Sequence, residues 1–289
     1  MMYLVIASLF AKAFGGMGSD EARSITLASD GDYVAAGHTA SFGVGVDFLV
    51  LKLSPDGSLA WAKTFGGTNE DFAYSIAQTL DGGYVIGGYT HSFGVSVWDC
   101  IVLKLNPDGS VAWAKTFGGA DEEECECVVP TSDSGCVAVG WTDSFGAGSR
   151  DILVIKLNSD GSVAWAKTYG GTSADYARCI TQTSDGGYAV AGYTISFGVG
   201  KVDFLMLKLN SDGSVAWAKT YGGPDDEYIR SIIQTSDGGY AVAGWTYSFG
   251  AGDADLLVIK LNSDGSVAWA KTYGGADEEC AKTIIQTSD

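Results

Sequence analysis

The sequence has few residues of the kinds that build catalytic sites. Its 289 residues include 2 histidines and 6 cysteines, with no CxxC pair, phosphate-binding loop, zinc motif or nucleophile elbow. Neither His38 nor His91 lies in a recurring Ser or Cys context. Paired carboxylates occur in every repeat of the chain, whereas a single active site would interrupt the repetition. We therefore predict a protein without enzymatic activity and without a cofactor.

Basic residues are also scarce, since 17 Lys and Arg stand against 35 Asp and Glu and give a net charge of −18. Such a surface repels phosphate backbones, which argues against nucleic acid and anionic membranes as partners. Cationic ligands, metal ions and basic proteins stay open, as does a role in solubility alone. No run of 18 or more apolar residues occurs, so we expect no membrane-spanning helix.

The N-terminus has no basic residue before its apolar stretch, Met1 to Phe10. Ala11-Lys12-Ala13 has the small-x-small form of a signal cleavage site. However, Phe10 to Gly16 matches Trp61 to Gly67 position by position. We favour a shortened repeat over a signal peptide.

Proline is rare at 4 residues and no helical period appears, whereas 41 glycines accompany many Val, Ile, Tyr, Trp and Thr. This composition indicates short strands joined by tight turns. The stretch Asp151 to Gly171 recurs nearly unchanged at 203–223 and 255–275, and more loosely at 47–67 and 99–119. The tryptophans that mark the copies lie 52 residues apart, at Trp61, Trp113, Trp165, Trp217 and Trp269.

Each unit divides into four strand-like segments. In the second unit these are residues 73–79, 84–90, 100–105 and 111–117, with Asp-Gly turns that supply the positive φ of tight hairpins. Four short antiparallel strands repeated at about 50 residues are typical of a β-propeller blade. An open solenoid is the rival, but its repeats are usually shorter. We predict an all-β protein, a propeller of four-stranded antiparallel blades.

The predicted domain is a single β-propeller over residues 1–289, with repeats at about 17–67, 68–119, 120–171, 172–223 and 224–275. Residues 1–16 and 276–289 resemble a fourth and a first strand. We expect them to lie side by side and to share a partial sixth blade, because an isolated strand would leave an unpaired edge. A fragment of a longer repeat protein is the alternative.

The repeat pattern Asp-x-x-Val-x-Lys-Leu-Asn-x-Asp-Gly-Ser, then Thr-Tyr-Gly-Gly, then Asp-Gly-Gly-Tyr-x-Val-x-Gly-Tyr-Thr, resembles the SBBP type of bacterial β-propeller repeat. Residues 151–194 carry the resemblance most clearly. It implies a secreted or cell-surface protein of a bacterium or archaeon, in a family generally described as seven-bladed. It implies no catalytic residues, because its motif residues form turns and core.

Two rings of side chains are candidates for ligand binding on the face that carries the loops between blades. The first is a polar position early in each first strand, where Arg23, Arg178 and Arg230 are the arginines. The alternative role for these arginines is ion pairing with the adjacent acids. The second ring is aromatic and lies near the end of each second strand, at Tyr89, Trp141, Tyr193 and Trp245, with His38 in the first unit. Its alternative role is packing between blades.

Other repeated residues suggest structural roles. We expect Gln78, Gln182, Gln234 and Gln286 to hydrogen-bond between neighbouring blades rather than to line a hydrated channel. The cysteines have no fixed place in the repeat, which predicts free and mostly buried thiols. Cys125 and Cys127 are two apart on a predicted strand, hence on one face, and are the one pair worth testing for metal. The acidic loops between blades are the better calcium candidates.

We expect a monomeric extracellular or cell-envelope scaffold that binds a protein or glycan partner through its loop face. A carbohydrate-binding or carbohydrate-active propeller is the alternative. Exposure of the aromatic ring around a pocket would favour the carbohydrate hypothesis, and burial of the ring between blades would remove its main support.

Overall fold

The computed structural model describes residues 12–95 and 97–287, and every regular element in these ranges is a β-strand. Blades one and two comprise β1 (Asp20–Leu27), β2 (Tyr33–Thr39), β3 (Asp47–Leu53), β4 (Leu59–Phe65), β5 (Asp71–Gln78), β6 (Tyr84–Thr90), β7 (Asp99–Leu105) and β8 (Val111–Phe117). Blade three comprises β9 (Glu123–Pro130), β10 (Cys136–Thr142), β11 (Asp151–Leu157) and β12 (Val163–Tyr169). Blades four and five comprise β13 (Asp175–Gln182), β14 (Tyr188–Thr194), β15 (Asp203–Leu209), β16 (Val215–Tyr221), β17 (Glu227–Gln234), β18 (Tyr240–Thr246), β19 (Asp255–Leu261) and β20 (Val267–Tyr273).

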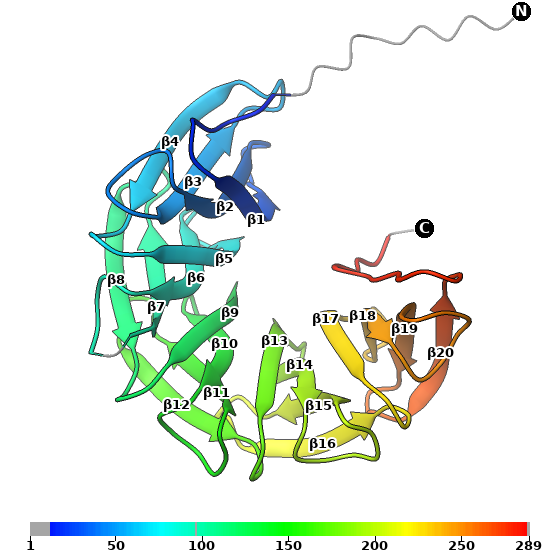
Figure 1. Ribbon diagram of the computed structural model, residues 1–289. Helices are drawn as coiled ribbons and strands as arrows, with labels where there is room; N and C mark the ends of the chain where they lie inside the picture. The colour runs from blue at the N-terminus through cyan, green and yellow to red at the C-terminus, as the bar shows by residue number, and fades with distance from the viewer. Residues whose placement is uncertain (1–11, 96, 288–289) are drawn as a thin grey trace, which may run out of the picture.

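The strands of each blade pair in chain order to form a four-stranded antiparallel sheet. The blades are arranged around a common centre, with the first strand of each blade innermost and the fourth strand outermost (Figure 1). In the second unit the observed strands lie within two residues of the predicted segments. The predicted fold class, a β-propeller, is confirmed.

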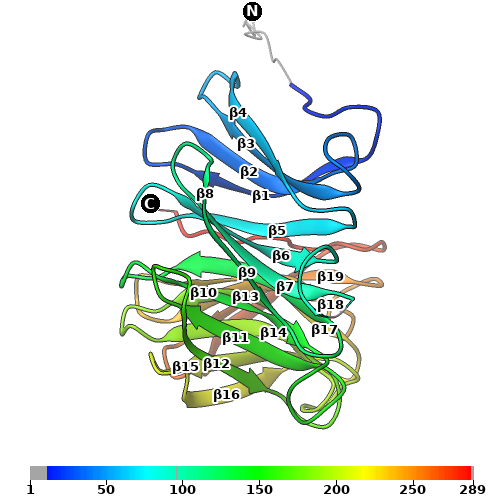
Figure 2. The ribbon, with the colours of Figure 1, turned by 90° about the vertical axis from the view of Figure 1, so that its left-hand side faces the viewer.

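The strands run roughly along the axis of the ring, so the connections lie on its two opposite faces (Figure 2). We call the upper face the one that carries the loops between blades and the loops between second and third strands. The turns within the hairpins lie on the lower face. In these turns Gly82 and its counterparts adopt positive φ, as Asp-Gly turns require, and Ser134 takes this conformation in blade three with φ of 69°.

The hydrophobic core lies between neighbouring blades rather than inside a single sheet. Each of four apolar clusters joins one pair of blades, and the outer-strand tryptophan packs at its edge. Trp165, for example, packs edge-on against Tyr188 with ring centroids 5.9 Å apart, and its Nε1 donates to the carbonyl oxygen of Ser211 at 3.1 Å. The repeated tryptophan is therefore an element that joins one blade to the next.

The repeated lysine of each third strand is buried and locks the lower-face turn. Lys156 is 4% exposed, and its Nζ donates to Asp133 Oδ1 at 3.0 Å and to the carbonyl oxygen of Leu157 at 2.9 Å. Blades two, four and five repeat both contacts. A buried ammonium needs such partners, because an unpaired buried charge is costly.

The ring of described residues is open, and the predicted partial sixth blade is not formed in it. Residues 12–19 lie along blade one, and residues 274–287 lie along blade five on the other side of the opening (Figure 1). Much of the predicted N-terminal strand falls on residues 1–11, outside the described residues. Phe14 nevertheless lies against blade one much as Phe65 lies against blade two, and Gly16 donates to Asp20 as Gly67 does to Asp71. This equivalence supports a shortened repeat at residues 12–16.

Within the two described ranges, no helix has the length and apolar character that a membrane span requires.

Candidate functional site

A β-bulge in the first strand of every blade aims one polar side chain at the centre of the ring. In blade four, Ala177 and Cys179 pair with the adjacent residues Gly192 and Ala191, so Arg178 is the extra residue. Arg23, Tyr74, Glu126 and Arg230 occupy the same position in the other blades. A bulge leaves its extra residue outside the ladder and redirects its side chain. The sequence marks these residues as polar but does not show how they come to face the centre.

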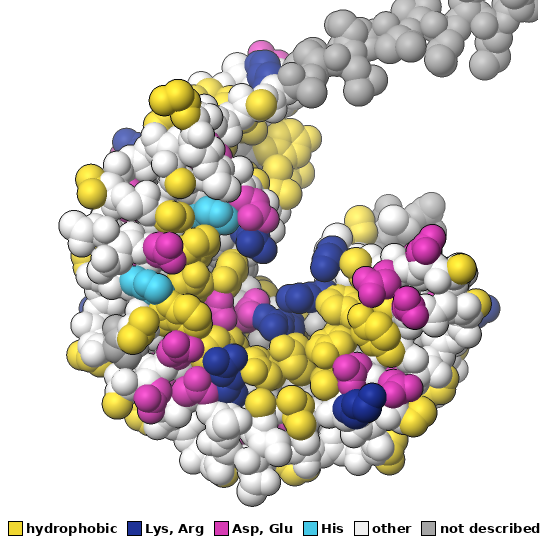
Figure 3. Space-filling model, in the orientation of Figure 1, with side chains coloured by type: hydrophobic (Ala, Val, Ile, Leu, Met, Phe, Trp, Pro, Cys, Tyr) yellow, Lys and Arg dark blue, Asp and Glu magenta, His cyan; other side chains and the backbone are white. Residues whose placement is uncertain are grey.

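Contacts between neighbouring inner segments bring Arg178 and Arg230, the bulge residues of blades four and five, together with Lys282 of the segment after blade five. The first strands of blades four and five, β13 and β17, contact each other, which places Arg178 and Arg230 close together. The N–H of Ile284 donates to the Oγ of Ser231 at 3.2 Å, next to Arg230, and so places Lys282 in line. We call Arg178, Arg230 and Lys282 the cationic rim. Figure 3 shows Lys and Arg side chains gathered at the inner edge of the arc, beside a hydrophobic patch.

Arg178 is largely neutralised, whereas the two cations beside it are not. Arg178 forms an ion pair with Glu126 of blade three and donates to the Tyr193 hydroxyl at 2.8 Å, although its buried Nε has no acceptor. Arg230 and Lys282 have no hydrogen-bond acceptor or ion pair among the described residues.

Both unpaired cations instead lie over the ring of Trp245, with the Arg230 Cζ 5.4 Å and the Lys282 Nζ 5.1 Å from its centroid. Burial and the neighbouring charge of Arg178 lower the pKa of Arg230. The cationic rim thus holds positive charge that the described residues do not balance.

Arg23, the third predicted arginine, is separate from this group. It is exposed, lies at the other side of the ring opening in blade one, and pairs with Glu21 at 3.1 Å. The structure therefore brings Arg178 and Arg230 together and leaves Arg23 apart.

The predicted aromatic ring is built of cross-strand pairs. Tyr89 stacks on Phe72, Tyr193 on Tyr176 and Trp245 on Tyr228, at centroid distances of 5.1, 4.7 and 5.2 Å. Contacts such as Tyr193 with Tyr228, at 5.0 Å, continue the packing from blade to blade. His38 and Trp141 are buried, and the other three are half-buried. Most ring faces are thus occupied by other side chains, which favours the packing role over a platform for sugars.

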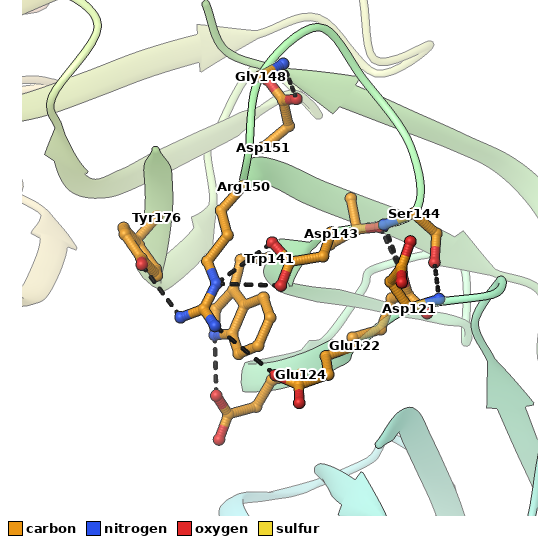
Figure 4. Close-up of polar contacts among 12 residues, drawn as sticks. Asp121, Glu122, Glu124, Trp141, Asp143, Ser144, Gly148, Arg150, Asp151 and Tyr176 are labelled. Atoms are coloured by element: carbon orange, nitrogen blue, oxygen red, sulfur yellow. Dashed lines mark hydrogen bonds and ion pairs between the residues drawn. The ribbon is translucent and has the colours of Figure 1, made fainter. Parts of the chain in front are cut away.

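Blade three differs from the others because Arg150 covers its aromatic residue (Figure 4). The Arg150 guanidinium lies 4.1 Å from the Trp141 ring centroid, and its Nε donates to both carboxylate oxygens of Asp143 at 3.2 Å. Its Nη1 donates to the Tyr176 hydroxyl at 3.1 Å, so the side chain links blades three and four. Trp141 donates to Glu124 at 2.8 Å.

Sequence reasoning missed this cluster. Its signal was a basic residue just before the third-strand aspartate, where the other units have Val46, Trp98, Val202 and Ala254.

In the acidic loops that were predicted as calcium sites, one carboxylate accepts hydrogen bonds from the neighbouring backbone and hydroxyl groups and so stabilises the loop. In blade two, Asp71 accepts hydrogen bonds from the N–H of Gly67 and the hydroxyls of Thr90 and Ser92. Glu123 makes the corresponding contacts with Gly119 and Thr142. Over residues 12–95 and 97–287 no group of three or more His, Cys, Asp or Glu side chains is placed to hold a metal ion. Calcium binding at these loops stays a prediction.

The prediction that Cys125 and Cys127 share one face is wrong. The bulge at Glu126 places them on opposite faces of the sheet, so that Cys125 packs with the core of blades two and three and Cys127 with that of blades three and four. All six cysteines are free, and four are buried, as predicted.

The predicted glutamine contacts between blades are confirmed. Gln78, Gln182, Gln234 and Gln286 each accept a hydrogen bond from a serine N–H of the preceding blade.

Comparisons with known proteins agree with this architecture. A family model described as "Domain of unknown function (DUF5122) beta-propeller" matches residues 28–59, 137–163, 183–215 and 235–267. The chain is a β-propeller repeat protein. The match supports the propeller repeat but not the SBBP type in particular. No curated protein matches the chain.

Two solved structures share the fold at 12% identity. The periplasmic gluconolactonase PpgL of Pseudomonas aeruginosa has a TM-score of 0.53, and the alignment covers 91% of this chain and 73% of that one. Sqt1 from Chaetomium thermophilum has a TM-score of 0.50, with coverage of 91% and 63%, so the chain spans less than two thirds of Sqt1. Identity this low shows a common fold and nothing about activity.

The prediction that the chain is not an enzyme needs correction. It rested on the view that a repeated scaffold without catalytic motifs has no activity, yet one similar structure is that of a gluconolactonase, which is the name of an enzyme. A propeller of this kind is therefore no ground for excluding catalysis, and we withdraw that exclusion.

Proposed function

We propose that this propeller binds a small anionic ligand at the inner edge of its upper face, at the cationic rim of blades four and five. The observation that carries the proposal is the pair of cations, Arg230 and Lys282, with no acceptor among the described residues. Arg230 is half-buried, and a charge in such a position is normally paired because desolvation of an unpaired charge is costly, whereas Lys282 is exposed and adds positive charge beside it. An anion would supply the missing partner.

The charge of the whole chain supports a small ligand over a polymer. A net charge of −18 repels an extended polyanion, whereas a small anion responds mainly to the charges nearest to it. The packing of the inner strands favours binding as well, since β13 and β17 contact each other and the segment that carries Lys282 is hydrogen-bonded to Ser231, so the cations are held in place before the ligand arrives.

A sugar platform on the aromatic ring is not part of the proposal. Tyr193 and Trp245 each have one face stacked on a tyrosine of their own blade, and Trp245 also carries two cations over its ring. The aromatic residues serve here to position the guanidinium and ammonium groups, and cation–π contacts of this kind contribute about 0.5–2 kcal/mol each.

We also propose that the chain acts as a single monomeric domain outside the cytoplasm or at the cell envelope. The resemblance to SBBP repeats and the shared fold with a periplasmic gluconolactonase support this location.

Isothermal titration of the purified chain with acetate, glucuronate and inorganic phosphate, at constant ionic strength, tests the proposal. Arg230→Gln should weaken binding of whichever anion binds, by about tenfold, which is the usual worth of a charged hydrogen bond. Lys115→Gln makes the same charge change on the exposed outer strand β8 and should leave binding unchanged. No binding of any of the three anions, or equal losses in the two variants, would refute the proposed function.

A further inference from the structure

We propose that the ligand of the cationic rim carries a single negative charge, as a carboxylate does, and that Glu126 sets this preference. The inference rests on the proposed function. It uses the arrangement of charges around the rim, in which Glu126 of blade three pairs with Arg178 of blade four, next to Arg230 of blade five and Lys282 of the segment that follows it.

Among the five bulge residues of the described strands, Glu126 is the one acid, and it is nearly buried. Its carboxylate pairs with Arg178, and its side chain is 12% exposed. The rim therefore contributes three positive charges and one negative charge, which leaves a surplus of two. Glu124, at the upper end of the same strand, accepts a hydrogen bond from Trp141 and adds negative charge on the same side of the centre.

This arrangement should bind a monoanion more tightly than a dianion. One carboxylate can accept from the Arg230 guanidinium, whose planar donors match two carboxylate oxygens, and from the Lys282 ammonium. The second charge of a phosphate would meet Arg178, which already has Glu126 as its partner, and would be repelled by that carboxylate. The Glu126 carboxylate thus takes the place that a second ligand charge would need at Arg178.

The residue at the bulge position differs in charge from blade to blade. The bulge position holds Glu only in blade three, directly beside Arg178 of blade four, whereas the neighbours of Arg230 are two cations. The free positive charge is therefore displaced toward Arg230 and Lys282, where the ligand carboxylate is expected to bind.

Competition between acetate or glucuronate and inorganic phosphate at pH 8, followed by isothermal titration, tests the inference. Wild-type protein should bind the carboxylates more tightly than phosphate. Glu126→Gln should raise phosphate affinity about tenfold and reverse the order, since it frees Arg178 and removes one repulsive charge. Glu126→Asp keeps the charge and should retain the wild-type order. Glu70→Gln, on an exposed upper-face loop, controls for the change in net charge.

The outcomes separate the two proposals. If no anion binds, the proposed function fails, and this inference fails with it. If anions bind and Arg230→Gln weakens them, but phosphate binds as tightly as carboxylates in the wild type, only the preference for a monoanion is overturned. An unchanged phosphate-to-carboxylate ratio in folded Glu126→Gln would overturn the role of Glu126. Circular dichroism of each variant establishes that it is folded.

Discussion

Replacement of the repeated tryptophan tests whether the blades are held together mainly by their outer strands. Trp165→Ala in blade three removes a side chain that reaches blade four, where it contacts Tyr188 and donates to the carbonyl oxygen of Ser211. Trp269→Ala is the matched control. Trp269 holds the same position in blade five, is 45% exposed, and has no indole acceptor among the described residues.

The expected losses follow from these contacts. The hydrogen bond of Trp165 is worth about 1 kcal/mol, the aromatic pair contributes about 1 kcal/mol, and burial of part of the indole adds about 1–2 kcal/mol. Trp165→Ala should therefore lower the free energy of unfolding by about 3 kcal/mol, at the low end for a buried tryptophan. Trp269→Ala lacks the first two contributions and should cost less than about 1 kcal/mol.

Thermal unfolding followed by far-ultraviolet circular dichroism, with urea unfolding as a second measure, distinguishes the variants. A loss of 3 kcal/mol corresponds to a fall in Tm of roughly 5–10 °C for a chain of this size. Equal effects of the two substitutions would refute the reasoning, because they would show that the contact with the next blade contributes nothing. A separate early transition in Trp165→Ala would mean that blades unfold one after another, as in repeat arrays.

Three further predictions concern the lower-face turns. Ser134→Gly should stabilise the protein by about 0.5–1 kcal/mol in urea unfolding, because Ser134 has a positive φ where the other units have glycine; a destabilised variant would contradict this. Asp133→Asn should cost about 1–2 kcal/mol, since the buried Lys156 loses its carboxylate, and the exposed turn variant Asp160→Asn should cost less than half as much. Burial raises the pKa of Asp81 and of Asp133, but hydrogen bonds from a threonine and a lysine outweigh it and lower the pKa of each to about 2. This stabilisation is present above the unfolded value near 3.8 and is lost as pH falls toward 2, so Tm should drop across that interval, and a flat Tm from pH 4 to 2 would contradict the assignment.

The repeat made the fold predictable because the sequence of each unit predicts the same four strands and the same turns. The Asp-Gly turns fix the hairpins, the apolar third strands require neighbours on both faces, and the glutamines at one position of the first strand predict contacts between blades. These features depend on local chemistry, which the sequence displays directly. Whether the ring closes depends instead on the angle between blades, which no local pattern encodes.

The bulge could not be predicted from the regular alternation of side chains between the two faces of a strand. Alternation places Cys125 and Cys127 on one face, whereas the bulge separates them. A signal was present, since the buried residues of the first strand, such as Ala73 and Ile76, are three apart instead of two. The Arg150 cluster was missed for another reason. The role of this single loop arginine depends on its contacts with Trp141 and Tyr176, which belong to different blades and are distant in the sequence.

The bulge also explains why the centre of the ring differs between blades while the rest of each unit is nearly constant. Residues at core positions contact the next blade, and a change there must suit both sheets. The bulge residue makes no ladder pair and lies outside the apolar clusters, so Arg, Tyr and Glu are all accommodated at one position. Charge can therefore be arranged around the centre without altering the fold. The cations of blades four and five, beside Glu126 of blade three, are such an arrangement, and their chemistry follows from the order in which nearly identical blades occur along the chain.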